Sequence, residues 1–86
     1  MNIADHRFEV RRFLYSRPTT AADVATIRHG LARWGVHITA AEIEAACAYL
    51  CGLDPAQAEL IKSKMGGGLK SWQITSEGCR AYEANE

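Results

Sequence analysis

The sequence predicts a mainly α-helical domain that carries one small β-hairpin. Apolar residues recur at helical spacing in three successive segments before residue 52 and again near the carboxyl end. Two of the helical segments are separated only by the short turn around Gly35. Between residues 58 and 75, strand-like segments flank three consecutive glycines. Because a chain of 86 residues can bury only one core, we expect residues 1–86 to form one domain.

The first helix is expected over residues 3–16, since the proline at position 18 disfavours helical backbone just before it. Its apolar stripe comprises Val10, Phe13 and Leu14. Arg7, Arg11 and Arg12 lie on neighbouring turns beside that stripe. We therefore expect a basic patch on this helix, partly offset by two nearby acids.

The second helix is expected to start at Thr20, whose hydroxyl can accept a hydrogen bond from a free amide of the first turn. Its inner face repeats at helical spacing through Val24, Ile27, Leu31 and Trp34. Gly35 follows in the position where a helix ends on a left-handed residue. This helix should therefore stop there.

The third helix is predicted by Thr39-x-x-Glu42, in which each side chain can bond the other residue's main-chain amide. Its inner face comprises Ile43, Cys47 and Leu50, with Ala46 alongside. About four residues separate it from the second helix. That spacing favours a helix-turn-helix over a plain helical hairpin.

The next segment reads as a β-hairpin, because three glycines at 66–68 permit the positive backbone angles of a tight tip. Alternation predicts that Trp72 and Ile74 pack inward and that Lys70 lies near the tip. Asp54-Pro55 is also a possible helix start, and we expect at most a short helical turn there.

A last helix is expected to begin at Ser76 or Glu77 and to run to about Ala84. Its inner positions are Cys79 and either Tyr82 or Ala81. This helix should close the core.

The composition favours a cytosolic globular protein. Ten basic residues balance ten acidic ones, so no global charge attracts nucleic acid. Residues 1–43 carry a net charge of +2 and residues 44–86 a net charge of −2, which is a mild asymmetry. No stretch is apolar enough to span a bilayer, so no membrane partner is expected. Three cysteines, an odd number, are expected to be free thiols.

The order of these elements resembles the winged-helix superfamily. The strand Trp72-Gln73-Ile74-Thr75 followed by Ser76-Glu77-Gly78 is similar to a second wing strand that runs into a Thr-x-x-Gly helix start. The segments at 13–18 and 48–50 also resemble small winged-helix proteins of Mu-like prophages. The resemblance implies a winged helix-turn-helix with a three-helix core, a β-wing and a carboxyl-terminal helix. It further implies a regulatory or phage-related role.

Members of that superfamily commonly place the third helix in the major groove of DNA, and their wing contacts an adjacent phosphate or the minor groove. The resemblance therefore implies that the outward residues of the third helix bind DNA, namely Ala40, Ala41, Glu44, Ala45, Ala48 and Tyr49. The wing would add Lys62, Lys64 and Lys70, and the second helix would add Arg28 and Arg33. The third helix departs from the usual pattern because it has no Arg, Lys, Asn or Gln to read base edges.

The alternative partner is a protein or a second copy of the chain. The surface formed by Ala45, Ala48 and Tyr49 has the small residues and single aromatic that suit a flat interface. Either function is non-enzymatic, and we expect no cofactor and no catalytic residue.

Histidine and cysteine patterns support that expectation. His6, His29 and His37 fall in different elements, and none neighbours a nucleophile. Cys47 and Cys51 are one turn apart, as two metal ligands would be, with Cys79 as a possible third. Because Cys47 and Cys51 lie on the apolar stripe, we expect them to act as small hydrophobes and to bind no metal.

Overall fold

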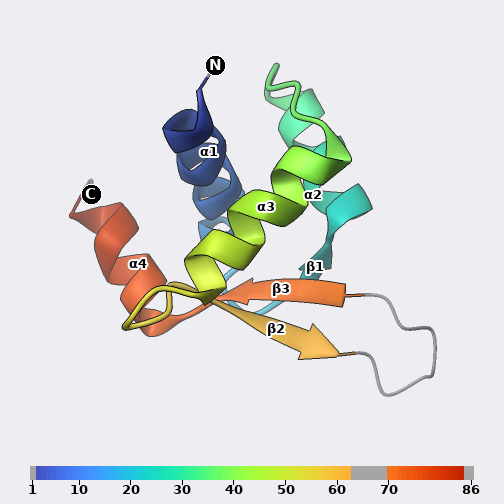
Figure 1. Cartoon of the computed structure of the whole chain (residues 1–86). Coiled ribbons are helices and arrows are strands. Elements are labelled where there is room, and N and C mark those ends of the chain that lie inside the picture. Colours follow the sequence, from blue (N-terminus) through green and yellow to red (C-terminus); the bar gives the residue numbers. More distant parts are fainter. Residues whose placement is uncertain (1, 63–69, 85–86) are drawn as a thin grey trace.

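A computed structural model describes residues 2–62 and 70–84, and of Lys62 it describes the main chain only. The elements in chain order are α1 (Ile3–Tyr15), β1 (Ala22–Asp23), α2 (Val24–Arg33), α3 (Ala40–Cys51), β2 (Ala58–Lys62), β3 (Lys70–Ile74) and α4 (Ser76–Glu83). The strands form an antiparallel sheet in the order β1-β3-β2 (Figure 1). The predicted mainly helical class with a β-hairpin is confirmed. Among the described residues, no helix has both the length and the apolarity needed to cross a bilayer.

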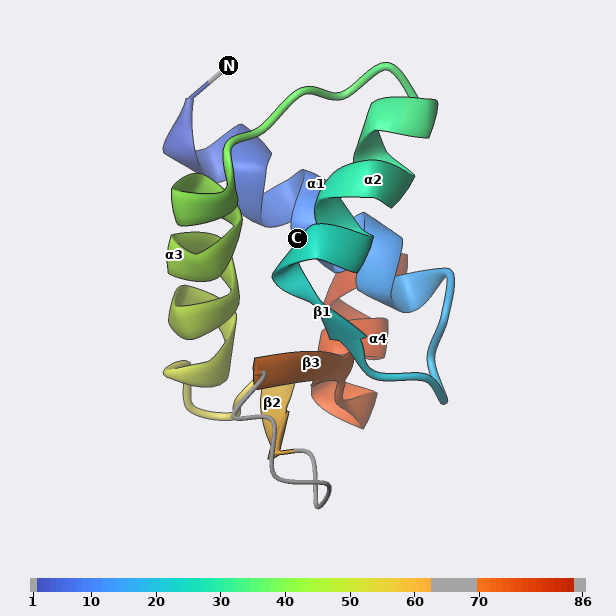
Figure 2. The same ribbon diagram turned by 90° about the vertical axis from the view of Figure 1, so that its right-hand side faces the viewer.

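The core lies between α1, α2 and α3 and is closed at one end by the sheet (Figure 2). α4 packs against α1 and lies at the left of the molecule in Figure 1, with α2 at the right. The buried apolar side chains include all the inner residues predicted for the first and third helices and for the hairpin: Val10, Phe13, Leu14, Ile43, Ala46, Cys47, Leu50, Trp72 and Ile74. In α4, Ala81 is buried, whereas Cys79 and Tyr82 are half-buried.

The predicted inward position of Trp34 is wrong. Its side chain is 41% exposed, because α2 ends at Arg33 and Trp34 is the cap residue where the chain leaves the helix. The indole instead packs on the outside of the core, tilted against Phe13 at a ring separation of 5.7 Å. Ile27 and Leu31 are fully buried, as expected for the same face of α2.

The turn between α2 and α3 follows the predicted chemistry. Gly35 has a φ of 78°, and the Val36 amide donates to the Leu31 carbonyl at 2.9 Å, which satisfies a carbonyl at the end of α2. α3 then starts with the predicted reciprocal cap. The Glu42 amide donates to Thr39 Oγ1 at 3.2 Å, and the Thr39 amide donates to Glu42 Oε1 at 3.1 Å.

The start of α2 differs from the prediction. Asp23, and not Thr20, is the cap, because its carboxylate accepts a hydrogen bond from the Thr26 amide at 2.7 Å. Ala22 and Asp23 are extended just before the helix and form β1, in which Ala22 pairs with Trp72 of β3. Hydrogen bonds from the amide and the side chain of Thr26 lower the pKa of Asp23, because they favour its ionised form.

The predicted hairpin is present, and β2 and β3 pair antiparallel with Leu60 opposite Trp72 and Lys62 opposite Lys70 at the Cα level. Its expected tip, the glycines at 66–68, lies outside the described residues. No helix forms at Asp54-Pro55.

The Thr-x-x-Gly sequence at the start of α4 has a packing explanation. Thr75 Oγ1 accepts from the Gly78 amide at 3.0 Å and donates to the Ala56 carbonyl at 2.6 Å. A Cβ on Gly78 would collide with the Gln57 carbonyl oxygen, so glycine lets α4 lie directly against this segment.

We predict that Asp23→Ala lowers the free energy of unfolding by about 1 kcal/mol, because an amide of the first turn of α2 loses its acceptor. Thr20→Ala, the matched control, should have a much smaller effect. Because the pKa of Asp23 is lowered in the folded state, its ionised carboxylate stabilises the fold at pH values above the ordinary pKa of Asp. This stabilisation is lost as the pH falls through the lowered pKa. The difference between wild type and Asp23→Ala should therefore be constant above about pH 5 and shrink below it. Urea denaturation across pH measures both effects, and equal losses for the two variants would contradict the assignment.

Candidate binding surface

The exposed part of α3 has two sides that differ in their neighbours. All six residues predicted to point outward are exposed: Ala40, Ala41, Glu44, Ala45, Ala48 and Tyr49. These residues divide into two groups according to the neighbouring element that each group faces. Glu44 faces the hairpin, whereas Tyr49 faces α1. We refer to these as the wing side, after the wing that the sequence predicts for this hairpin, and the α1 side of α3.

The wing side is joined to the hairpin by an ion pair. Lys70 Nζ of β3 lies 3.5 Å from Glu44 Oε1, and both side chains are more than half exposed. This ion pair places α3 next to the hairpin, and it offsets the charge of Lys70 with that of Glu44. Lys62 is opposite Lys70 in the sheet register, but its side chain lies outside the described part of the structure, as does all of Lys64.

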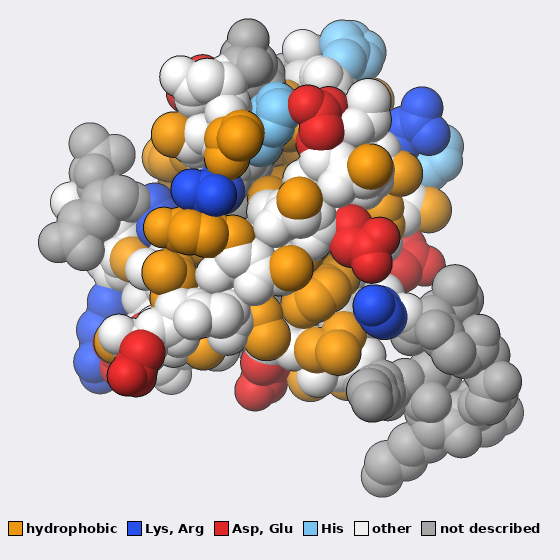
Figure 3. Space-filling model, viewed as in Figure 1, with side chains coloured by type: hydrophobic (Ala, Val, Ile, Leu, Met, Phe, Trp, Pro, Cys, Tyr) orange, Lys and Arg blue, Asp and Glu red, His pale blue; other side chains and the backbone are white. Residues whose placement is uncertain are grey.

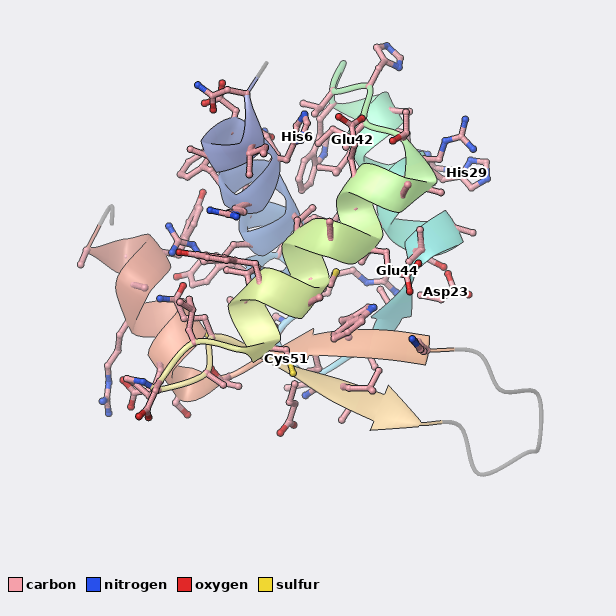
Figure 4. All side chains as sticks on the ribbon, viewed as in Figure 1. His6, Asp23, His29, Glu42, Glu44 and Cys51 are labelled. Carbon is pink, nitrogen blue, oxygen red and sulfur yellow. The ribbon has the colours of Figure 1, made fainter. Side chains whose placement is uncertain are left out.

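One arginine and two histidines line a cleft of about 400 Å³ at the amino end of α3. It is bordered by Arg28, His29, Ala32, Val36, His37, Ile38 and Thr39. His29 and Glu44 both lie on the right-hand side of the molecule in Figure 4. The histidines were predicted to fall in different elements, yet the turn at Gly35 brings His29 and His37 to one cleft. Because His29 precedes this turn in the sequence and His37 follows it, their sequence positions could have indicated that the two side chains lie close together.

Arg33 does not join this group. It borders a different cleft, of about 450 Å³, together with Phe13 and Trp34. Five residues separate Arg28 from Arg33, so the two side chains leave α2 in different directions. Of the two predicted arginines, only Arg28 lies beside α3.

The α1 side of α3 is mostly apolar. The Arg7 guanidinium stacks on the Tyr49 ring at 3.4 Å from its centroid. Ile3, Phe8 and Tyr49 are among the exposed large hydrophobic residues, at 63%, 37% and 43%. Clefts of about 360 and 380 Å³ flank the stacked pair, and Arg7 borders both. Ile3 and Phe8 could not be assigned to this surface from the sequence, because an isolated solvent-facing apolar residue on a helix has no distinctive spacing.

The basic patch predicted for the first helix does not form. Arg11 is buried and donates to Gln57 Oε1 at 2.7 Å. Arg12 pairs with Glu9 at 2.8 Å and lies over the Trp34 ring. For the residues that the structure describes, Figure 3 accordingly shows hydrophobic side chains along α3, with separated basic and acidic groups and no continuous basic area on this face.

The cysteines are free thiols, and the described residues contain no cluster of three or more His, Cys, Asp or Glu side chains that could hold a metal ion. Cys47 is fully buried, whereas Cys51 and Cys79 are half-buried. Burial, and secondarily the charge of Glu44, raises the pKa of the Cys47 thiol to about 12. His6 Nε2 lies 3.5 Å from Glu42 Oε2. The same carboxylate accepts the hydrogen bond from the Thr39 amide that caps α3.

Comparisons with models of known protein families, with curated proteins and with solved structures find no match. The function therefore has to be inferred from the geometry and chemistry of this surface.

We predict that alkylation of the folded protein by iodoacetamide at pH 8 modifies Cys51 and Cys79 well before Cys47. With a pKa of about 12, only about one Cys47 thiol in ten thousand is ionised at that pH, and the side chain is also shielded. Mass spectrometry of peptides after timed labelling measures the order. Labelling in urea should remove the difference, and rapid labelling of Cys47 in the folded protein would contradict its burial.

Proposed function

We propose that the chain is a winged-helix module that binds duplex DNA through the wing side of α3. The order α1-β1-α2-α3-β2-β3-α4 supports the winged-helix assignment. So does the sheet, in which β1 pairs with the strand that leads from the hairpin into α4. A fold alone does not define a function, so the choice of DNA depends on the surface.

One observation supports DNA over other ligands. Cationic groups flank an exposed stretch of small residues on α3, with Arg28 at its amino end and Lys70 at the wing. The major groove is about 12 Å wide and admits one helix, with a phosphate backbone along each edge. A helix in the groove with cations on both flanks can contact both backbones, and such contacts supply most non-specific affinity.

The middle of the surface has few groups for reading bases. Ala40 and Ala48 are small enough to approach thymine methyl groups, and Glu44 can accept a hydrogen bond from a cytosine amino group. Glu44 also holds Lys70 and repels phosphate, so DNA must compete with this ion pair for the lysine. Two or three phosphate contacts correspond to a loss of affinity of about ten- to fortyfold between 50 and 200 mM salt.

We predict that Glu44→Gln strengthens DNA binding by about three- to tenfold at low salt, because it removes a repulsive charge and releases Lys70. Fluorescence anisotropy with a labelled random duplex measures the dissociation constant. Glu77→Gln is the matched control, since Glu77 also pairs with a cation, Arg80, but on α4 and away from the surface. It should change affinity much less.

The two arginines of α2 give a second matched pair. Arg28→Glu should weaken binding by about tenfold or more, whereas Arg33→Glu makes the same change of charge outside the surface and should have a smaller effect. Equal effects would mean that only net charge matters. No binding by the wild type at 50 mM salt would overturn the proposal.

A further inference from the structure

We propose that the groove between α1 and α3 is a self-association site that binds a second copy of this chain, with the two α3 helices antiparallel about a two-fold axis near Ala45. The α1–α3 groove is defined by Ile3, Arg7, Ala41, Glu42, Ala45 and Tyr49. This surface adjoins the proposed DNA contacts, because Ala41, Ala45 and Tyr49 directly follow Ala40, Glu44 and Ala48 and are turned by about 100° around α3. The proposal does not depend on DNA binding.

The groove contains both a projecting group and a cavity that can receive it. Tyr49 projects near the carboxyl end of α3 and is 43% exposed. The cavity of about 360 Å³ lies near the amino end, and its lining by Ile3, Ala41 and Ala45 is mostly apolar. Tyr49 is eight residues from Ala41, or about 12 Å along the helix. An isologous interface brings each surface patch against the same patch of the other copy.

A two-fold axis near Ala45 therefore places the projecting Tyr49 of each copy against the cavity of the other. Positions four residues before and after Ala45 exchange places, so Tyr49 of each copy lies over Ala41 of the other. The alanines at positions 41 and 45 have no side chain beyond Cβ, which lets the two helices approach to about 8 Å between axes. An antiparallel pair thus fills both cavities at once.

Charge is complementary in the same arrangement. Arg7 is stacked on Tyr49, so it accompanies the ring towards the cavity of the other copy. Glu42 borders that cavity, and its side chain is 44% exposed. Each copy therefore brings a guanidinium to the carboxylate of the other, and the pair forms twice. This offset of the guanidinium from the carboxylate along the α1–α3 groove matches a second copy and gives a foreign partner no equivalent symmetry.

Sedimentation velocity and light scattering from about 10 µM to about 1 mM test the proposal. We expect the mass to rise with concentration from 9.5 kDa towards twice that value. Ala45→Glu should raise the dimer dissociation constant at least tenfold, because it sets two carboxylates against each other at the axis. Ala32→Glu adds the same charge at an exposed alanine of α2, outside the groove, and should leave self-association unchanged.

A second variant tests the ion pair without disturbing the fold. Glu42→Gln keeps an acceptor for the cap of α3 but removes the charge, and it should weaken self-association by about three- to tenfold. A chain that stays at 9.5 kDa up to about 1 mM overturns the proposal and leaves the groove to a different protein. Self-association that Ala45→Glu does not change also overturns it, because the copies would then meet through another surface.

Discussion

The left-handed backbone at Gly35 is the constraint on which the rest of this structure depends. With a φ of 78°, it reverses the chain at the end of α2 and allows Val36 to bond back to Leu31. A side chain at this position would be strained whatever space surrounds it. The reversal directs Ile38 into the core and lets Thr39 cap α3 immediately afterwards. The orientation of α3, and with it every proposed contact, follows from this bend.

The side chains of α3 itself provide little chemistry, because alanine occupies most of its exposed positions. Neighbouring elements provide it instead. α1 adds Arg7 to one side, and the hairpin adds Lys70 to the other. A helix with small exposed residues can thus present two distinct surfaces, and the tertiary fold determines what each one binds.

Sequence reasoning succeeded where the cause of the structure is local. The caps at Thr39 and Gly35 and the inward alternation of Trp72 and Ile74 depend on residues close in the chain, so they could be predicted. β1 could not, since its two residues have no periodicity and are held by pairing with β3, about fifty positions away. Because this pairing keeps Ala22 and Asp23 extended, the cap of α2 is Asp23 and not the predicted Thr20.

The same distinction explains the errors at the candidate surface. Arg11 occupies a position typical of a solvated face, but the half-buried Gln57, 46 positions away, provides a partner that no local pattern indicates. Arg28 and Arg33 look equivalent in the sequence, and only the packing of α2 separates them. Predicting which charges meet requires the relative positions of helices, which short-range spacing does not specify.

The two proposed activities are linked through the shared helix. An α-helix with its side chains is about 10–12 Å across, close to the 12 Å width of the major groove, so two α3 helices about 8 Å apart between axes cannot enter one groove together. Self-association through the α1–α3 groove would therefore favour the state in which α3 is withheld from DNA. Because linkage is reciprocal, DNA would favour the separate chains by the same factor. If both proposals hold, the apparent affinity for DNA should fall as the protein concentration passes the dimer dissociation constant, and Ala45→Glu should abolish that fall.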